Sequence, residues 1–193
     1  MAPDLDKARD HLEKYKQETG QSELSFDISF DVGSKVKADT AATLQQQWAQ
    51  IGVKTTLTPL EQTQFLAAVA FGNYQMSWFR NFGWKDPDFN YIFWHSSTAN
   101  PPGQVSVNFT QTKVPALDTA LDTGRENTDD AVRTEAYGTA FRELNRYASH
   151  LWLYYATWAM IARDTVAGLD VVQRAGFARQ DAKTWWTRIW LKQ

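Results

Sequence analysis

The sequence predicts an α/β fold in which helices flank a parallel or mixed sheet, and three observations support this class. Apolar residues alternate with polar ones from Leu24 to Phe30, which is the period of a strand with one buried face. From Ala41 to Ile51 apolar residues recur instead at helical spacing. Strand and helix patterns continue to alternate as far as Phe79, and this order is typical of strand–helix–strand units with parallel strands.

Each element of the N-terminal half has recognisable start and stop signals. A first helix begins with Asp4 or Asp6 as its N-cap and ends at Gly20. A helix from Asp39 to Ile51 ends at Gly52, where a left-handed residue is favoured. The elements expected next are a strand with Val53, Thr55 and Leu57, a helix with Phe65, Leu66 and Val69, and a strand from Tyr74 to Phe79.

The C-terminal half is predicted to be mainly helical before a last strand. Asp86-Pro87-Asp88 is a helix start, because it combines a capping acid, a proline suited to the first turn and a second acid at the positive helix end. Thr128-Asp129-Asp130 caps another helix, whose apolar stripe is expected to pack on a sheet. The stripe consists of Tyr137, Phe141, Leu144 and Ala148. Leu151 to Thr157 is expected to return as a buried strand.

Composition narrows the function classes. The 193 residues, 43% of them hydrophobic, are enough for one well-cored domain plus a tail. The 20 basic and 22 acidic residues are interspersed, so nothing favours nucleic acid as a partner. The lack of cysteine excludes disulfides, thiolate nucleophiles and Cys-ligated zinc. Nine tryptophans exceed what a core of this size requires, and we expect some of them to face a ligand or a partner surface.

No motif in the sequence indicates catalysis or a cofactor. A glycine-rich phosphate loop, a Gly-x-Ser-x-Gly elbow and a recognisable Ser/His/Asp set are all missing. His11, His95 and His150 are scattered without metal-ligand spacing, so no metal site is expected. Asp86 and Asp88 are two residues apart and do not converge on one substrate atom, and helix capping explains both. We therefore expect a protein that is not an enzyme and needs no cofactor.

The stretch from Ile51 to Asp88 resembles one family. Its order is Leu44 and Trp48 on a helix, an Ile51-Gly52-Val53 step, a strand, a helix ending at Phe71-Gly72-Asn73-Tyr74, and a Gly83-Trp84 loop followed by Asp86-Pro87. This is similar to the peptide-type (family 5, cluster C) extracellular solute-binding proteins of ABC importers. Members have several hundred residues in two lobes around a ligand cleft. The resemblance covers the C-terminal lobe and implies a single ligand-binding lobe of the type II periplasmic-binding-protein fold.

The resemblance also implies domain boundaries, location and partners. Residues 1–165 would form the C-terminal α/β lobe, and residues 166–193 would return towards a missing N-terminal lobe. The parent protein would be extracytoplasmic, either periplasmic or a cell-surface lipoprotein, although no export signal stands at the start of this chain. Its partners would be a peptide or small-molecule solute and an ABC permease. The fragment itself could self-associate through apolar surface that the missing lobe would cover.

The predicted ligand site lies beyond the carboxyl ends of the strands, where ligands of open α/β sheets bind. It combines stacking faces, one cation, one amide and flexible turns, a set suited to a polar organic solute. Its residues are Asp31, Gly33, Trp78, Arg80, Asn81, Gly83 and Trp84. Structural alternatives stay open: Trp78 as a core residue, Arg80 as a solvated side chain and Asp31 as a helix-entry or turn residue.

Two departures from the family pattern bear on the solute. Dipeptide-binding members carry an aspartate in the loop for the peptide amine and an arginine after the first strand for the carboxylate. Here those positions fall at Gly83 or Trp84 and at Asp31, so neither charge is present and the dipeptide mode is not expected. The expected solute is oligopeptide-like or another polar organic molecule, with a sugar or oligosaccharide as the alternative. A glycosidase-like enzyme using Asp31 or Asp86, and a self-associating interaction domain, are the alternatives of other classes.

Overall fold

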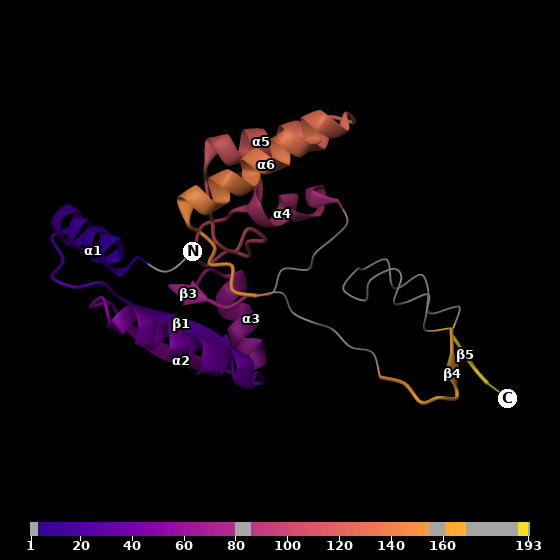
Figure 1. Cartoon of the computed structure of the whole chain (residues 1–193), viewed down its shortest axis with the longest axis horizontal. Helices are drawn as coiled ribbons and strands as arrows, with labels where there is room; N and C mark the ends of the chain where they lie inside the picture. The colour runs from indigo at the N-terminus through magenta and orange to yellow at the C-terminus, as the bar shows by residue number, and fades with distance from the viewer. Residues whose placement is uncertain (1–3, 80–85, 155–160, 169–188, 193) are drawn as a thin grey trace. The chain divides into compact units, whose positions relative to one another are not determined.

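The computed structural model describes residues 4–79, 86–154, 161–168 and 189–192 (Figure 1). The chain divides into two compact units. Unit 1 comprises Met1–Phe79 and Asn100–Phe109, and unit 2 comprises Arg80–Ala99 and Thr110–Gln193. These units are defined by the contacts within each of them. They do not test the predicted lobe boundary after residue 165, which stays a prediction.

Unit 1 has the alternating elements that the sequence predicts. They are α1 (Leu5–Thr19), β1 (Ser25–Asp31), α2 (Lys35–Ala49), β2 (Lys54–Leu60), α3 (Gln62–Ala70) and β3 (Met76–Ser77). The Asp4 carboxylate accepts a hydrogen bond from the Lys7 backbone N–H at 2.9 Å, and Gly20 ends α1 with a φ of 70°. The predicted caps of the first helix are therefore confirmed.

The three strands form a parallel sheet in the order β2-β1-β3. Ser29 of β1 stands in register with Thr58 of β2 and with Ser77 of β3. The predicted parallel strand–helix–strand arrangement is thus confirmed, and strand β1 is the centre of the described sheet. Residues that share a register position in parallel strands point to the same face, so each face of the sheet can be read from β1.

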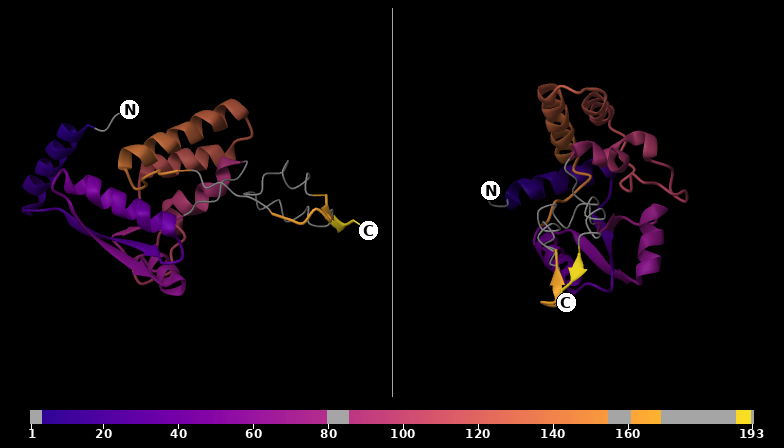
Figure 2. Two further views of the ribbon diagram at one scale, coloured as in Figure 1. Left: turned by 60° about the horizontal axis from the view of Figure 1, so that its bottom comes forward. Right: turned by 90° about the vertical axis from the view of Figure 1, so that its right-hand side faces the viewer.

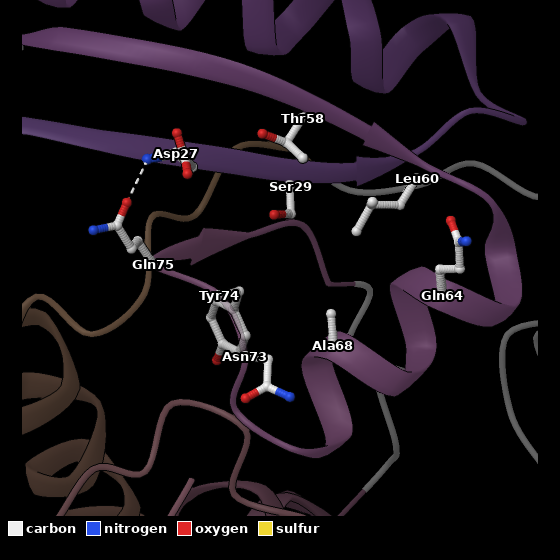
Figure 3. A pocket seen from close by; sticks show the side chains of 9 residues that line it. All are labelled: Asp27, Ser29, Thr58, Leu60, Gln64, Ala68, Asn73, Tyr74 and Gln75. Atoms are coloured by element: carbon white, nitrogen blue, oxygen red, sulfur yellow. Dashed lines mark hydrogen bonds between the residues drawn. The ribbon is translucent and has the colours of Figure 1, made fainter. Parts of the chain in front are cut away.

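The two faces of this sheet differ sharply in polarity. Ile28 and Phe30 of β1 are buried in a core with Ala41 and Leu44 of α2. The residue between them, Ser29, points to the other face, where polar side chains gather (Figure 3). Parallel sheets are usually apolar on both faces because helices cover both. The alternating sequence of β1 therefore gives unit 1 one apolar face and one polar face.

Unit 2 is helical in its described residues up to Tyr147. Its elements before residue 150 are η1 (Pro87–Asn90), α4 (Tyr91–Trp94), η2 (Ser96–Thr98), α5 (Pro115–Glu126) and α6 (Asp130–Tyr147). Both predicted helix starts are confirmed: the Asp86 carboxylate accepts from the Asp88 backbone N–H at 3.0 Å, and Asp129 caps α6.

The helices α5 and α6 pack against each other around a core of their own. Leu117 and Leu121 of α5 and Tyr137 and Leu144 of α6 are its buried centre, together with Trp94. The expectation that α6 packs on a sheet is wrong, because Tyr137 and Leu144 of its stripe pack in a core with α5 instead. The other two residues of the stripe are exposed: Phe141 keeps 42% of its surface accessible, and Ala148 is the C-cap that ends α6.

The expected buried strand after α6 is also wrong where it can be followed. Leu151–Tyr154 forms no strand, and its four side chains are exposed. The rest of the predicted strand, residues 155–157, lies outside the described residues. Further on, β4 (Val166–Ala167) pairs antiparallel with β5 (Trp190–Leu191), so the two ends of the predicted return segment lie side by side (Figure 2). No helix within the described ranges has the length and apolar character required to span a membrane.

Candidate functional site

Asp31 ends strand β1 at the carboxyl edge of the sheet, where the sequence placed a ligand residue. Asp31 is buried, with 8% of its surface exposed. The chain then turns through Gly33 to Ser34, whose hydroxyl accepts from the Lys37 backbone N–H at 3.4 Å and caps α2. Helix α2 therefore begins at Lys35, four residues before the predicted Asp39. The early start brings a lysine of the first turn back towards the end of the strand.

Lys37 is the functional candidate that the sequence analysis missed. Its ammonium group donates a hydrogen bond to Oδ1 of Asp31, and the two side chains are 16% and 12% exposed. The same ammonium lies 5.5 Å from the centroid of the Phe65 ring on α3, within the range of a cation–π contact. A charge pair six residues apart across a turn leaves no periodic signal, which is why the sequence alone did not indicate it.

The remaining predicted site residues divide into three groups. Trp78 is 7% exposed and belongs to the core of unit 1, and its backbone N–H donates to the Ser29 carbonyl at 3.2 Å. Gly33 is exposed, and a Cβ built on it would lie 3.7 Å from Oδ2 of Asp31, so these two residues are neighbours. The others, Arg80, Asn81, Gly83 and Trp84, lie outside the described residues.

A hollow of about 530 Å³ lies over the polar face of the sheet (Figure 3). Its walls are β1, β2, α3 and the segment leading into β3. The lining residues are Asp27, Ser29, Thr58, Leu60, Gln64, Ala68, Asn73, Tyr74 and Gln75. Volumes of this size are typical of small-molecule sites, although such sites are generally more apolar. Sequence reasoning did not nominate this hollow, but the polar alternation of β1 and β2 was its visible signal.

Uncharged hydrogen-bonding groups dominate the hollow. Among the described lining residues, Asp27 alone has a carboxyl group, and it is exposed to solvent. The Gln75 side-chain oxygen accepts from the Asp27 backbone N–H at 2.8 Å, and the Tyr74 hydroxyl donates to the Phe109 carbonyl at 2.5 Å. Burial raises the pKa of Tyr74, so the phenol stays neutral. Amides and hydroxyls of this kind suit a neutral polar ligand.

The two acids Asp86 and Asp88 are held in ion pairs. Arg125 donates from Nε and Nη2 to the Asp88 carboxylate at 2.9 and 3.0 Å, and Arg133 donates to Asp86 at 2.7 Å. Hydrogen bonding to Arg125 lowers the pKa of Asp88. Burial, with the nearby charge of Asp88, raises the pKa of Tyr137 to about 12. These carboxylates anchor the start of η1 to α5 and α6. The structural role predicted for the Asp-Pro motif, the start of a helix, therefore explains both acids.

Unit 2 also holds two of the three histidines. The Nε2 atom of His95 lies 3.5 Å from the Asp122 carboxylate, and the His95 ring stacks on Tyr91. His150 stacks on Trp152, and burial lowers the pKa of His150. Within the described ranges, no three histidine or acidic side chains come together as a metal site would require.

Comparison with known protein families identifies one family whose sequence model matches this chain. Residues 2–102, just over half of the 193-residue chain, match the sequence model of the bacterial extracellular solute-binding proteins, family 5, in its middle part. The chain belongs to this family. A search of curated protein sequences gave no significant match. Relatives in the family are solute-binding proteins and not enzymes.

Solved structures agree with the family 5 fold. A putative peptide-binding protein AppA from Clostridium difficile matches with a TM-score of 0.71 at 18% identity, over 98% of this chain and 37% of that one. The periplasmic binding protein DppA from Helicobacter pylori, in complex with the peptide STSA, matches with a TM-score of 0.69 at 19% identity, over 98% and 35%. NikZ from Campylobacter jejuni, in complex with Ni(L-His), matches with 0.60 at 22%, over 73% and 30%.

These matches confirm the predicted α/β class and periplasmic-binding-protein fold. Their identities are below 25%, so the likeness concerns the fold and leaves the ligand open. The family 5 chain described here spans about a third of the length of these proteins.

Proposed function

We propose that this chain forms one wall of the solute site in the substrate-binding component of an ABC importer, and that the solute is a polar organic molecule. The match of residues 2–102 to family 5 carries this proposal. The position of Asp31 at the carboxyl edge of a parallel sheet supports it, because this is where open α/β sheets bind ligands. The opposite wall would belong to a second lobe, and closure of the two lobes would be the state that a permease recognises.

The residues proposed to meet the solute are at and beyond this edge. Asp31 and Gly33 contribute a carboxylate and an exposed turn. Trp78 lies in the core of unit 1, and in this proposal its indole would form the floor of the site. The loop residues Arg80, Asn81, Gly83 and Trp84 remain part of the proposed set. The parent protein would act outside the cytoplasm, as family 5 proteins do, in the periplasm or as a lipid-anchored surface protein.

An oligopeptide-like solute is the first candidate, because peptide-binding proteins are among the structural matches. A sugar or oligosaccharide is the second candidate. The hollow on the polar sheet face favours it, because amide and hydroxyl groups predominate in its lining. Both candidates carry neutral hydrogen-bonding groups, namely peptide amides in the first and hydroxyls in the second.

The test compares this chain with the two-lobed protein proposed here by isothermal titration calorimetry. The titrants are a tetra-alanine peptide and maltotriose, after native mass spectrometry of the two-lobed protein has identified any co-purified solute. The two-lobed protein should bind one solute class, and this chain should bind it about 100-fold or more weakly because one wall is missing. Equal affinity in the single chain, or turnover of the solute, would refute the proposal.

A further inference from the structure

We propose that Asp31 and Lys37 form an internal counter-ion pair that makes the carboxyl edge of β1 selective for an uncharged group of the solute. This inference rests on the proposed function, because it assigns a substrate class to the same site. Lys37 thereby becomes a specificity-determining residue. Neither the sequence patterns nor the family match assigns it a role.

The pair is set apart by its burial. Asp31 and Lys37 keep 12% and 16% of their side-chain surface exposed. Another lysine–aspartate pair on the same helix, Lys35 and Asp39, has an N–O distance of 2.7 Å but side chains that are 84% and 62% exposed. Water screens the exposed pair, whereas the charges of the buried pair depend on each other.

This mutual dependence works against charged solute groups. A carboxylate that bound Lys37 would compete with Asp31, and an ammonium group that bound Asp31 would compete with Lys37. Either exchange leaves one largely buried charge without its partner, which is strongly unfavourable. The Phe65 ring adds a second contact that holds the Lys37 ammonium in place. Binding of an anion or of a cation at this edge is therefore electrostatically unfavourable.

A neutral donor meets no such cost. The bond from Lys37 uses Oδ1 of Asp31. Within the described part of the chain Oδ2 accepts no hydrogen bond, and it lies on the side of the exposed Gly33 turn, 3.7 Å from where a Cβ of that residue would be. An amide N–H or a hydroxyl of the solute can donate to Oδ2 while the ion pair stays intact. The recognised group is thus a neutral hydrogen-bond donor.

The experiment uses the whole 193-residue chain and three small probes of nearly the same shape. These are acetamide, acetate and acetamidinium, which are neutral, anionic and cationic. Each is titrated while NMR follows the backbone amides of Asp31 and Gly33. In the wild-type chain, acetamide should give saturable shifts and the two ions should give none at equal concentration. Saturable shifts with either ion, of the size produced by acetamide, would overturn the proposal.

Variants then test the origin of the selectivity. Asp31→Asn leaves Lys37 without its counter-ion, so affinity for acetate should rise about tenfold or more. Lys37→Met leaves Asp31 unpaired, and affinity for acetamidinium should rise in the same way. Asp39→Asn is the matched control, because it frees the solvated Lys35 on the same helix and should gain nothing. A gain of acetate binding in Asp39→Asn equal to that in Asp31→Asn would overturn the assignment.

A variant that fails to fold does not prevent the test, because the titration of the three probes into the wild-type chain tests the selectivity for a neutral group by itself. It also separates this inference from the proposed function. The probes report on the Asp31 edge only, so a neutral preference can hold even if neither tetra-alanine nor maltotriose binds the two-lobed protein. Conversely, solute binding by the two-lobed protein together with ion binding at Asp31 would support the function and refute the inference.

Discussion

Asp88 shows how a single carboxylate can join three elements. It follows the capping Asp86 at the start of η1, accepts two hydrogen bonds from Arg125 of α5, and receives a third from the Tyr137 hydroxyl of α6 at 3.3 Å. The Arg125 guanidinium also lies 3.6 Å from the centroid of the Tyr91 ring. The charge of Asp88 is therefore part of what fixes η1 on the helix pair.

The first prediction concerns the acid stability of unit 2. Because the Arg125 bonds lower the folded-state pKa of Asp88 below its ordinary 3.8, the folded state gains stability at pH values above that figure. This gain is lost as the pH falls through the lower, folded-state pKa. Asp88→Asn should destabilise the chain by about 1 kcal/mol near neutral pH, since the pair is partly exposed, and should flatten the stability curve between about pH 5 and pH 3.

Urea unfolding at several pH values, followed by tryptophan fluorescence, measures this effect. Glu135→Gln is the control, because its pair with Arg142 is 76% and 63% exposed and should contribute little. Parallel stability curves for wild type and Asp88→Asn below pH 5 would contradict the argument.

Residue-level prediction from sequence worked where the signal is local. The caps Asp4, Asp86 and Asp129 bond to backbone groups two or three residues away, so their roles can be read from neighbouring letters. Lys37 could not be found this way. Its contacts with Asp31 and Phe65 depend on how a strand, a turn and two helices come together.

At the scale of elements, the contact between α5 and α6 depends on Gly124. A Cβ built on this residue would lie 2.6 Å from Cζ of Tyr137, closer than real Cβ contacts come. The Tyr137 ring cannot readily move aside, because its hydroxyl bonds Asp88 and Arg133 lies 5.3 Å from its centroid. The glycine thus sets how closely the two helices approach.

We predict opposite effects for two helical glycines. Gly124→Ala should destabilise the chain by about 1–3 kcal/mol through overpacking against Tyr137. Gly138→Ala on α6 is the matched control, since its nearest neighbour is the flexible end of Arg142 at 3.4 Å. Alanine there should stabilise the chain by up to about 1 kcal/mol through helix propensity. Chemical denaturation of both variants checks the pair, and equal effects of the two substitutions would show that the helix contact is not limiting.

Element types were predicted better than element partners. The alternation of β1 and the helical spacing of α2 gave the correct elements, because periodicity reflects which side of an element is buried. The start of α2 was missed, since Lys35 to Asp39 carries no apolar period. The stripe with Tyr137 and Leu144 predicts a buried face of α6 but not that α5 covers it. The apolar run from Leu151 to Thr157 predicts a strand that its described part, Leu151–Tyr154, does not form. An apolar pattern predicts that one surface of an element is buried or forms an exposed apolar patch, but it does not identify the element that packs against this surface.

At the scale of the whole molecule, the two cores share none of the residues that the structure describes. Ile28 is the fully buried centre of one, and Leu121 of the other. Substitutions within one such cluster remove contacts from that cluster alone. Each unit is therefore expected to behave as its own unit of local stability.

Hydrogen exchange followed by NMR tests this independence. Ile28→Ala should cost about 2–5 kcal/mol and speed amide exchange in β1 and α2, while leaving α5 and α6 unchanged. Leu121→Ala should do the reverse. If either substitution accelerates exchange to the same extent in β1 and α2 as in α5 and α6, the two units unfold together and the prediction fails.

The site was predictable only in outline at this scale. A parallel sheet directs attention to the carboxyl ends of its strands, and this rule predicts a site in the loop from Arg80 to Trp84. Asp31 and its neighbour Gly33 enter the predicted site through the family pattern instead. The polar hollow at Ser29 and Thr58 was not nominated, although both strands alternate in the sequence. An alternating strand in a parallel sheet predicts an open or wet face, and that combination is visible only once the pairing is known.

The proline in strand β2 has a consequence for the solubility of the chain. The Val32 N–H bonds the Leu60 carbonyl and the Lys54 N–H bonds the Leu24 carbonyl, so Lys54 and Leu60 point their backbone groups towards β1. Pro59, adjacent to Leu60, therefore faces the outer edge of the described sheet, where its lack of an N–H breaks the row of donors. On the same edge the Thr55 carbonyl is already occupied by the Gln45 side chain at 2.6 Å. A strand from another molecule would find neither group available, so this edge resists the intermolecular pairing from which aggregates grow.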